Sequence, residues 1–349
     1  TTMKKRLFLD IETPMITGGI LPDKIFLIVG KDAESKEIFS FTEDKLEDFK
    51  TLVSSYDEFV GHNIIGFDAP VINKVLAIDL HQQGKVIDTL ILSRLFNPVR
   101  EGGHSLKSWG DALRFDKLDF KDFSQYSDEM LTYCVRDVEV TEKVLTYLIR
   151  KYPDFSKEAI RLEHDVSRII TQQERNGFLF DMGNAHLLLG KLREKINEIE
   201  IKVKERFIPL PTFVKQVIPR RRKDGTLSTV GLNSLGQGWV NVMGEFSLIE
   251  MKEFNLGSRQ QIGRYLQYFG WKPTKFTDKG HIIVDEKVLE GVKDIPEAEL
   301  IRDFLLLQKR IAQVGSWVEA VAEDGGVHGR VITNCAVTVR MSHQSPNIA

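Results

Sequence analysis

The amino-acid sequence predicts an α/β protein in which a mixed β-sheet with covering helices is followed by a mainly helical part. Over the first 150 residues, short apolar runs alternate with amphipathic stretches in the order three strands, helix, strand, helix, strand, helices. From residue 156 onward, apolar positions recur at helical spacing over much longer stretches. A chain of 349 residues is also long enough for two domains.

The elements of the first part are bounded by turn and capping residues. We expect strands at residues 6–11, 25–31, 37–42, 58–61 and 85–87. We expect helices at residues 44–56, 68–79, 89–96 and 105–113. Asp68 can cap the second of these helices, and Pro70 is tolerated in its first turn. A further helix begins after Ser127 and stops before Pro153.

The second part is dominated by long helices. We expect them at residues 156–176, 181–206, from 258 onward and at 297–322. Ser258 and Gln261 can form a capping box at the start of the third. Residues 207–255 interrupt this pattern with prolines, glycines and the basic cluster Arg220–Lys223, and we interpret them as an irregular or hairpin-rich insertion. We therefore place domains at residues 1–155 and 156–330, with a final segment at 331–349.

Composition excludes several classes of protein. Hydrophobic residues make up 42% and charged residues 28%, as in soluble globular proteins. No uninterrupted apolar run approaches the ~18 residues that a membrane span needs, and Met3-Lys4-Lys5-Arg6 does not lead into a signal peptide. Cys134 and Cys335 provide neither a disulfide framework nor a zinc site. We expect an intracellular protein without a membrane partner.

The net charge of −2 conceals an asymmetry. Residues 1–150 contain 19 Lys and Arg against 25 Asp and Glu, whereas residues 151–349 contain 29 against 25. An acidic half that holds cations beside a basic half that follows phosphates is typical of a nuclease that grips a duplex. Ordinary scatter of charges is an equally good interpretation of this observation alone.

Acidic side chains stand at the ends of several expected elements. Asp10 and Glu12 are two residues apart at the end of the first strand, so their carboxylates project from the same face. Their strand is apolar, and burying two like charges side by side is costly unless a cation compensates. Asp68 begins a helix, where a capping role is as good an interpretation as catalysis. Asp137 falls within the apolar arc of its helix, one turn after Tyr133.

Taken together, four carboxylates and a tyrosine are poorly explained as core packing. Oxygen-only ligands select Mg²⁺ or Mn²⁺. Two such ions ~3.5–4 Å apart can activate a water and stabilise the leaving 3′-oxygen of a phosphodiester. Asp88, at another strand end, is interpreted as structural or as supporting these residues indirectly.

Three motifs resemble the DEDDy 3′→5′ proofreading exonucleases of A-family DNA polymerases, particularly the replicases of T-seven-like phages. They are Asp10-Ile11-Glu12-Thr13, Gly61-His62-Asn63 through Phe67-Asp68, and Tyr133-Cys134-Val135-Arg136-Asp137. The stretches at residues 87–94 and 104–110 also look like the phage enzymes. The resemblance implies a ribonuclease H-like exonuclease domain with a mixed sheet over residues 1–155.

The resemblance also implies roles for individual residues. Asp10, Glu12 and Asp137 would hold one Mg²⁺ or Mn²⁺, and Asp10 with Asp68 would hold a second. Tyr133 would orient the attacking water. Thr13 and Asn63 would contact the terminal nucleotide of a single-stranded 3′ end. The resemblance to phage enzymes also implies that the protein acts in the cytoplasm of an infected bacterium.

The second part resembles a polymerase thumb, which grips the primer–template duplex. The stretches at residues 174–181, 255–262 and 275–280 carry this resemblance, and residues 333–347 resemble the start of a palm. The residues we expect to contact DNA are Ser258, Arg259, Lys279 and Arg340. Val339 departs from the family, which usually has Gly before the arginine. Residues 207–255 are shorter than the insertion that binds thioredoxin in a phage member, so a thioredoxin processivity factor is doubtful.

The resemblance does not extend to the carboxylates of the palm or to the fingers. We therefore expect DNA synthesis only together with these parts, which either belong to a second polypeptide or have been removed from this one. Two alternatives remain open: an autonomous exonuclease of the RNase D type, and a non-catalytic module that holds DNA. The thumb-like half argues against the former, and the complete set of acids argues against the latter.

Overall fold

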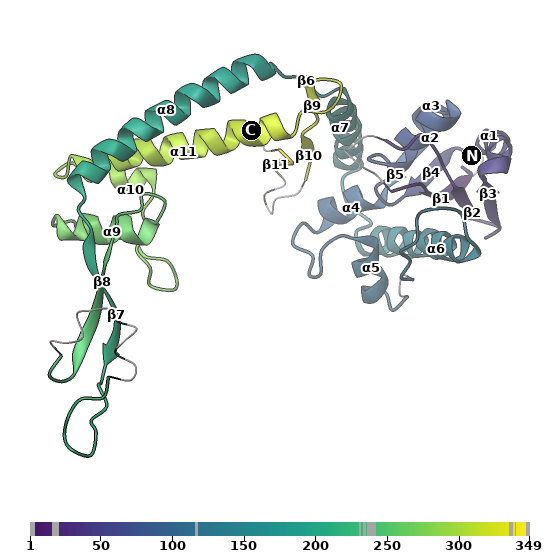
Figure 1. The fold of residues 1–349 in the computed structure, drawn as a ribbon. Helices are drawn as coiled ribbons and strands as arrows, with labels where there is room; N and C mark the ends of the chain where they lie inside the picture. Colours follow the sequence, from purple (N-terminus) through teal and green to yellow (C-terminus); the bar gives the residue numbers. More distant parts are fainter. Residues whose placement is uncertain are drawn as a thin grey trace. The chain divides into compact units, whose positions relative to one another are not determined.

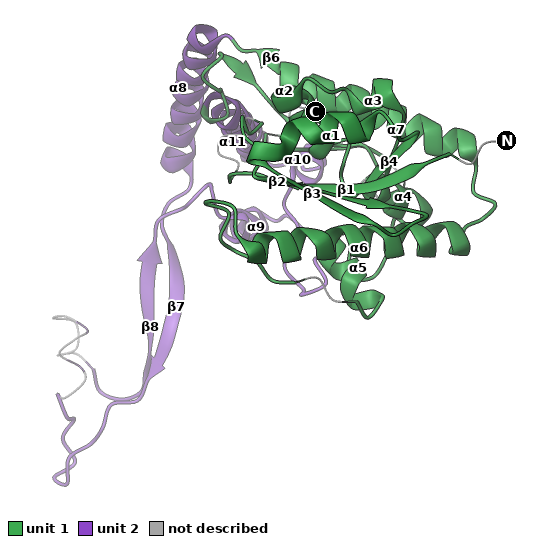
Figure 2. Ribbon diagram, turned by 90° about the vertical axis from the view of Figure 1, so that its right-hand side faces the viewer, with its two compact units in different colours: residues 1–180, 319–349 green, residues 181–318 purple. Residues whose placement is uncertain are grey.

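The computed structural model describes residues 4–15, 21–115, 118–229, 232, 235, 242–334, 338 and 340–346. Cys335 and Val339 lie outside these residues. The chain divides into two compact units, unit 1 with residues 1–180 and 319–349, and unit 2 with residues 181–318 (Figure 2). The helix that follows residue 156 therefore belongs to the same unit as the sheet.

Unit 1 contains a five-stranded mixed sheet in the order β3-β2-β1-β4-β5. Its strands are β1 (Arg6–Glu12), β2 (Leu27–Asp32), β3 (Ile38–Thr42), β4 (Glu58–Gly61) and β5 (Lys85–Asp88). Strands β1, β2 and β3 form an antiparallel meander, whereas β4 pairs parallel with both β1 and β5. The predicted mixed sheet and its element order are thus confirmed.

Helices cover both faces of this sheet. On one side lie α1 (Leu46–Val53), α2 (Asp68–Leu76) and α3 (Leu80–Gln83), and on the other lies α6 (Asp128–Lys151) (Figure 1). Against α6 pack α4 (Thr89–Phe96) and α5 (Leu106–Ala112), and α7 (Lys157–Asn176) packs against α4. The unit is completed by the short strands β6 (Phe178–Leu179), β9 (Gly326–Val327), β10 (Arg330–Ile332) and β11 (Ser342–Gln344).

The two faces of β1 contribute to different cores. Leu7, Leu9 and Ile11 belong to the core beneath α1, α2 and α3, whereas Phe8 belongs to the core beneath α6. Because side chains alternate along a strand, Asp10 and Glu12 follow Phe8 on the face toward α6. The apolar alternation of one strand therefore directs both acidic side chains toward one helix.

Asp88 ties together the ends of two neighbouring strands. Its carboxylate accepts hydrogen bonds from the backbone N–H groups of Leu90 and Ile91, which caps α4. The same carboxylate accepts from the N–H groups of Asn63 (2.9 Å) and Ile65 (3.1 Å), in the loop that follows β4. Asp88 is 1% exposed, so these bonds are shielded from water. The structural role considered for Asp88 is confirmed.

The loop between β4 and α2 allows little variation in its backbone. Asn63 has a φ of 67°, a left-handed conformation that Asn tolerates better than most residues. A Cβ on Gly66 would lie 2.5 Å from the Asn63 side-chain oxygen, and one on Gly61 would lie 2.7 Å from the Cβ of Ile64. Neither glycine therefore leaves room for a side chain in the loop that leads to Asp68.

Unit 2 is mainly helical, with one long hairpin. Its helices are α8 (Met182–Arg206), α9 (Arg259–Tyr268), α10 (Glu286–Glu290) and α11 (Glu297–Glu319), and its hairpin pairs β7 (Leu210–Val217) with β8 (Phe246–Lys252). The core gathers around Phe207, Tyr265 and Phe304. The hairpin confirms the hairpin-rich interpretation of residues 207–255. Among the described residues, no helix is both long and apolar enough to cross a bilayer.

Three details of the sequence predictions were wrong. Asp68 makes no side-chain capping bond, because Phe67 is the N-cap and Asp68 is the first residue of α2. The capping box at Ser258 is only half formed, since the Gln261 side chain accepts from the N–H of Asn255 instead of that of Ser258. The helix expected at residues 44–56 begins as a 3-10 turn, Glu43–Lys45, and ends at Val53.

We expect Asp88→Ala to destabilise the protein by about 3–4 kcal/mol, because it leaves buried backbone donors without an acceptor. Urea unfolding followed by far-UV circular dichroism measures this change. Asp88→Asn keeps an acceptor oxygen in place and should lose less, and Asp154→Asn at an exposed turn should change little. Equal urea midpoints for Asp88→Ala and the unaltered protein would show that these bonds contribute nothing net.

Candidate metal centre

The candidate centre is built first from the end of β1. Asp10 is partly buried and Glu12 is 6% exposed. The pairing of β1 with β4 stops at Phe8, so the acidic residues follow the last parallel pair. Parallel β1, β4 and β5 end at one edge of the sheet, and such edges commonly carry the functional groups of α/β proteins.

Helix α6 contributes the second side of the centre. Its start is defined by Ser127, whose hydroxyl accepts from the N–H of Met130 at 3.1 Å, as the sequence predicts. Cys134 and Asp137 lie one turn apart on its buried face, with 0% and 3% exposure. Ligand atoms of Asp10, Glu12 and Cys134 all lie within 4.8 Å of one another. The structure thus brings together residues that are more than 120 positions apart.

Cys134 is a member of this cluster that sequence reasoning missed. Its thiol donates to Asp10 Oδ2 at 3.5 Å and to the Asp10 carbonyl oxygen at 3.6 Å. Burial raises the pKa of this thiol well above its ordinary value, and the nearby Asp10 and Glu12 carboxylates add to the effect. The only available sequence signal was its place between Tyr133 and Asp137, one turn before the acid.

Asp68 reaches the same cluster from α2. It is 3% exposed, and burial raises its pKa well above the ordinary value. Repulsion from the Asp10 carboxylate raises the pKa further. A hydrogen bond from the backbone N–H of Ile11, next to Asp10 on β1, acts in the opposite direction. Asp68 and Asp10 are therefore close neighbours in a region of low dielectric, where two ionised carboxylates repel strongly.

The donor set suits a hard divalent cation. The carboxylates of Asp10, Glu12 and Asp68 are oxygen donors of the kind that Mg²⁺ and Mn²⁺ prefer. The Cys134 thiol donates a hydrogen bond to the Asp10 carboxylate, which adds a neutral group beside these oxygen donors. A cation among these carboxylates would offset the repulsion that burial creates.

Tyr133 precedes Cys134 on α6 and lies within an aromatic group. Its ring centroid is 5.5 Å from that of Phe120 and 6.1 Å from that of Phe123. The same tyrosine lines a cavity of about 410 Å³ together with Leu118 and Thr132. Tyr133 is partly buried among these rings, which restrict the movement of its side chain.

The residues expected to touch DNA fall in different places. Thr13 is buried and its hydroxyl donates to the Pro14 carbonyl, while Asn63 lies in the loop held by Asp88. In unit 2, Ser258 caps α9, and Arg259 donates to the Val284 carbonyl at 2.6 Å. Lys279 is exposed in unit 2, and Arg340 is exposed in unit 1. Contacts of these residues with DNA remain predictions.

Comparisons with known proteins point to DNA polymerases. No protein-family model matches the chain. The DNA-directed DNA polymerases of Enterobacteria phage T3 and Escherichia phage T7 are each 30% identical to it over alignments of 382 residues, which cover 83% of this chain. The chain spans about half the length of these relatives, 54% in each case.

A solved structure shows the same fold over most of the chain. The polymerase domain of Pol1 from M. smegmatis, in complex with a DNA primer-template and a dNTP, matches 99% of this chain and 52% of that chain. The TM-score is 0.65 and the identity is 14%, which shows similarity of fold alone. The relationship between this chain and DNA polymerases is supported by the phage sequences.

We expect Asp68→Asn to stabilise the metal-free protein at neutral pH. The folded-state pKa of Asp68 is raised above the ordinary 3.8. Between the unfolded-state pKa and the folded-state pKa, the folded protein keeps a proton that the unfolded chain has released, so stability falls as pH rises from one to the other. Asn carries no charge at any pH, so its advantage should shrink as pH falls toward about 4. Thermal unfolding in EDTA at several pH values measures the difference.

Exposed Asp154→Asn is the matched control and should follow the unaltered protein at every pH. Adding Mn²⁺ should raise the melting temperature of the unaltered protein more than that of Asp68→Asn, because a ligand that binds the folded state stabilises it. If Asp68→Asn melted below the unaltered protein at neutral pH in EDTA, the described repulsion would not govern Asp68.

Proposed function

We propose that this chain carries a 3′→5′ exonuclease that removes nucleotides by two-metal phosphodiester hydrolysis, as the proofreading and DNA-gripping part of a replicative A-family DNA polymerase. The observation that carries the proposal is the convergence of Asp10 and Glu12 on β1 with Asp68 and with the α6 residues Cys134 and Asp137. The similarity to phage DNA-directed DNA polymerases supports the same conclusion. The mixed sheet is also what the resemblance to a ribonuclease H-like exonuclease domain implies.

Asp10, Glu12 and Asp137 would hold one metal ion, and Asp10 with Asp68 would hold the other. When bound, Mg²⁺ or Mn²⁺ ions at such a site activate a water and stabilise the leaving 3′-oxygen. The protein's own part is to aim these carboxylates before the metal arrives: β1 directs Asp10 and Glu12, and the Cys134 thiol restrains Asp10 through its hydrogen bond.

Tyr133 would orient the attacking water, and Thr13 and Asn63 would position the terminal nucleotide. The aromatic neighbours of Tyr133 limit the movement of its ring and so favour one direction for its hydroxyl. Asn63 is held at a left-handed backbone conformation by the Asp88 carboxylate, which fixes where its side chain starts. Neighbouring residues thus hold both side chains in place before a substrate binds.

Unit 2 would act as a polymerase thumb. It is mainly helical, and it contains the basic cluster Arg220–Lys223 beyond the β7–β8 hairpin. Arg221 donates to the Gly225 and Met243 carbonyls and so helps to hold this tip together. All four residues of the cluster are exposed. The exposed cations are available to phosphates.

An autonomous RNase D-like exonuclease and a non-catalytic DNA-holding module are the alternatives. The similarity to DNA polymerases extends over 83% of the chain, which favours a polymerase part over the former. The buried acidic cluster favours catalysis over the latter, because its cost has no compensation in a purely structural role. Cleavage and primer-extension assays separate the three.

We expect the purified chain to shorten single-stranded DNA from its 3′ end with Mg²⁺ or Mn²⁺ and to release nucleoside 5′-monophosphates. Changing Asp10 and Glu12 together to Ala should lower the rate by ~10³-fold or more, since water activation and leaving-group stabilisation are lost together. Tyr133→Phe should be milder, about 10–100-fold, because it removes one orienting group and leaves the carboxylates intact. End-labelled oligonucleotides, with and without EDTA, provide the measurement.

The matched control is Glu129→Gln, an exposed position in the first turn of α6, which should cleave normally. Cleavage that persists in EDTA, or that begins at the 5′ end, would contradict the two-metal proposal. A Tyr133→Phe defect as severe as that of the double variant would mean that Tyr133 does more than orient a water.

We expect primer extension only when a palm and fingers are supplied, either within a longer chain or by a second polypeptide. The chain resembles the exonuclease and thumb of its relatives, and these regions carry no polymerising carboxylates. Alone it should shorten a primer, and with the complementing part it should extend one. Co-expression, size-exclusion chromatography and a primer-extension assay without added thioredoxin measure association and synthesis, and extension by this chain alone would overturn the assignment.

A further inference from the structure

A second site is suggested by a cavity of unit 1 whose lining includes none of the acidic residues of the cluster. The cavity has a volume of about 650 Å³ and is bounded by α2, α3 and the C-terminal half of α7. Its polar lining includes Asn73, His81, Arg168, Gln172 and Arg175. None of these residues belongs to the proposed exonuclease machinery.

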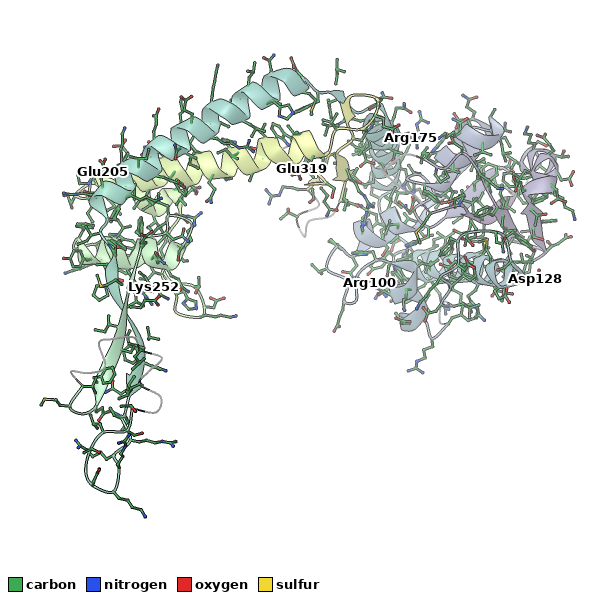
Figure 3. The ribbon with its side chains drawn as sticks, in the orientation of Figure 1. Arg100, Asp128, Arg175, Glu205, Lys252 and Glu319 are labelled. Carbon is green, nitrogen blue, oxygen red and sulfur yellow. The ribbon has the colours of Figure 1, made fainter. Side chains whose placement is uncertain are left out.

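Two arginines bring positive charge to this cavity. Within the described part of the chain, neither Arg168 nor Arg175 forms an ion pair or a hydrogen bond. Arg175, at the C-terminal end of α7 (Figure 3), is partly buried, and burial lowers its pKa. The Glu174 carboxylate acts on the Arg175 pKa in the opposite direction. Because no hydrogen bond joins the two side chains within the described residues, an anionic ligand that pairs with the guanidinium would offset the remaining cost of its burial.

In the part of the chain that the structure describes, two acidic side chains near the arginines accept hydrogen bonds from backbone N–H groups and form none with the guanidinium groups. Asp79 lines the cavity, but its carboxylate caps α3 by accepting from the N–H of His81 at 2.9 Å. Glu174, next to Arg175 in sequence, accepts from the N–H of Val331 in β10. The cavity is therefore a place where a phosphate could pair with a guanidinium through two parallel hydrogen bonds.

The rest of the lining suits a ring and a sugar better than a phosphate alone. Ala69 and Pro70 of α2 form an apolar wall, and Phe178 adds an aromatic ring. Asn73 and Gln172 carry amides that can both donate and accept. The volume falls within the ~300–1,000 Å³ that small-molecule sites occupy and exceeds what one phosphate fills.

We propose that this cavity binds a nucleoside 5′-phosphate, with the phosphate at Arg175 and Arg168 and the base against Pro70 and Phe178. The choice of a nucleotide among phosphate-bearing molecules rests on the proposed function, whose product and substrate both contain this group. The nucleotide can be free or part of a single strand. Helix α2 contributes Asp68 to the carboxylate cluster and Pro70 and Asn73 to this cavity. A nucleotide bound in the cavity would therefore contact the same helix that carries Asp68.

Isothermal titration calorimetry of the full chain in EDTA tests the proposal. The probes are thymidine 5′-monophosphate, thymidine, inorganic phosphate and an oligothymidylate of about eight nucleotides. We expect the monophosphate to bind more tightly than thymidine or phosphate. Arg175→Gln and Arg168→Gln should each weaken it by about tenfold or more, the usual effect of losing a charged hydrogen bond.

Arg161→Gln is the matched control, because Arg161 is an exposed arginine of α7 that does not line the cavity. If the oligothymidylate binds more tightly than the monophosphate and the same two variants weaken its binding, the natural ligand is a single strand. If the monophosphate binds more tightly than the oligothymidylate, the natural ligand is a free nucleotide. Equal weakening by Arg161→Gln, or binding of phosphate as tight as that of the monophosphate, would overturn the proposal.

Far-UV circular dichroism and thermal melting establish that each variant is folded. If Arg175→Gln fails to fold, Arg168→Gln still tests the proposal, because Arg168 is exposed. The outcome is separable from that of the exonuclease. Metal-dependent cleavage without binding in this cavity would overturn this inference alone. Binding here without any cleavage would support the nucleotide site while contradicting the proposed hydrolysis.

Discussion

The hydrogen bonds accepted by Asp88 are the interaction on which the arrangement of unit 1 depends. One carboxylate satisfies backbone donors at the start of α4 and in the loop that follows β4. The Asp88 N–H donates in turn to Nε2 of His164 at 2.9 Å, which attaches α7 to the same strand end. Because burial makes each bond costly to break, the loop, α4 and α7 hold one geometry together. That geometry places Asp68 on one side of α2 and the arginine-lined cavity on the other.

The acidic cluster illustrates how a site can oppose the stability of its scaffold. Asp10, Glu12 and Asp68 are brought together where repulsion is strong, and the Cys134 thiol provides one neutral hydrogen bond to that group. The cost is borne by the apolar cores on the two sides of the sheet, which contain the largest fully buried side chains of the unit. A scaffold of this kind can keep carboxylates aimed before a cation arrives, which is what pre-arrangement requires.

Much of unit 1 and its candidate site could be predicted from local sequence. The apolar alternation of β1 determined that Asp10 and Glu12 share a face, and Ser127 with the apolar arc of α6 determined where Asp137 points. The hairpin at residues 207–255 was expected from its prolines and glycines. Asp68 was only half understood, because its capping role was plausible from sequence and absent in the structure.

The sequence by itself determined the order of elements, the mixed sheet and which acids could share a centre, since these follow from short-range periodicity and capping. Only the tertiary structure decided that Cys134 faces Asp10, 124 positions away, and that α7 leaves a charged cavity against α2. Local sequence contains no record of such contacts, because they depend on how the sheet and its covering helices pack against one another. A buried thiol and two arginines acquire chemical meaning only when that packing places them.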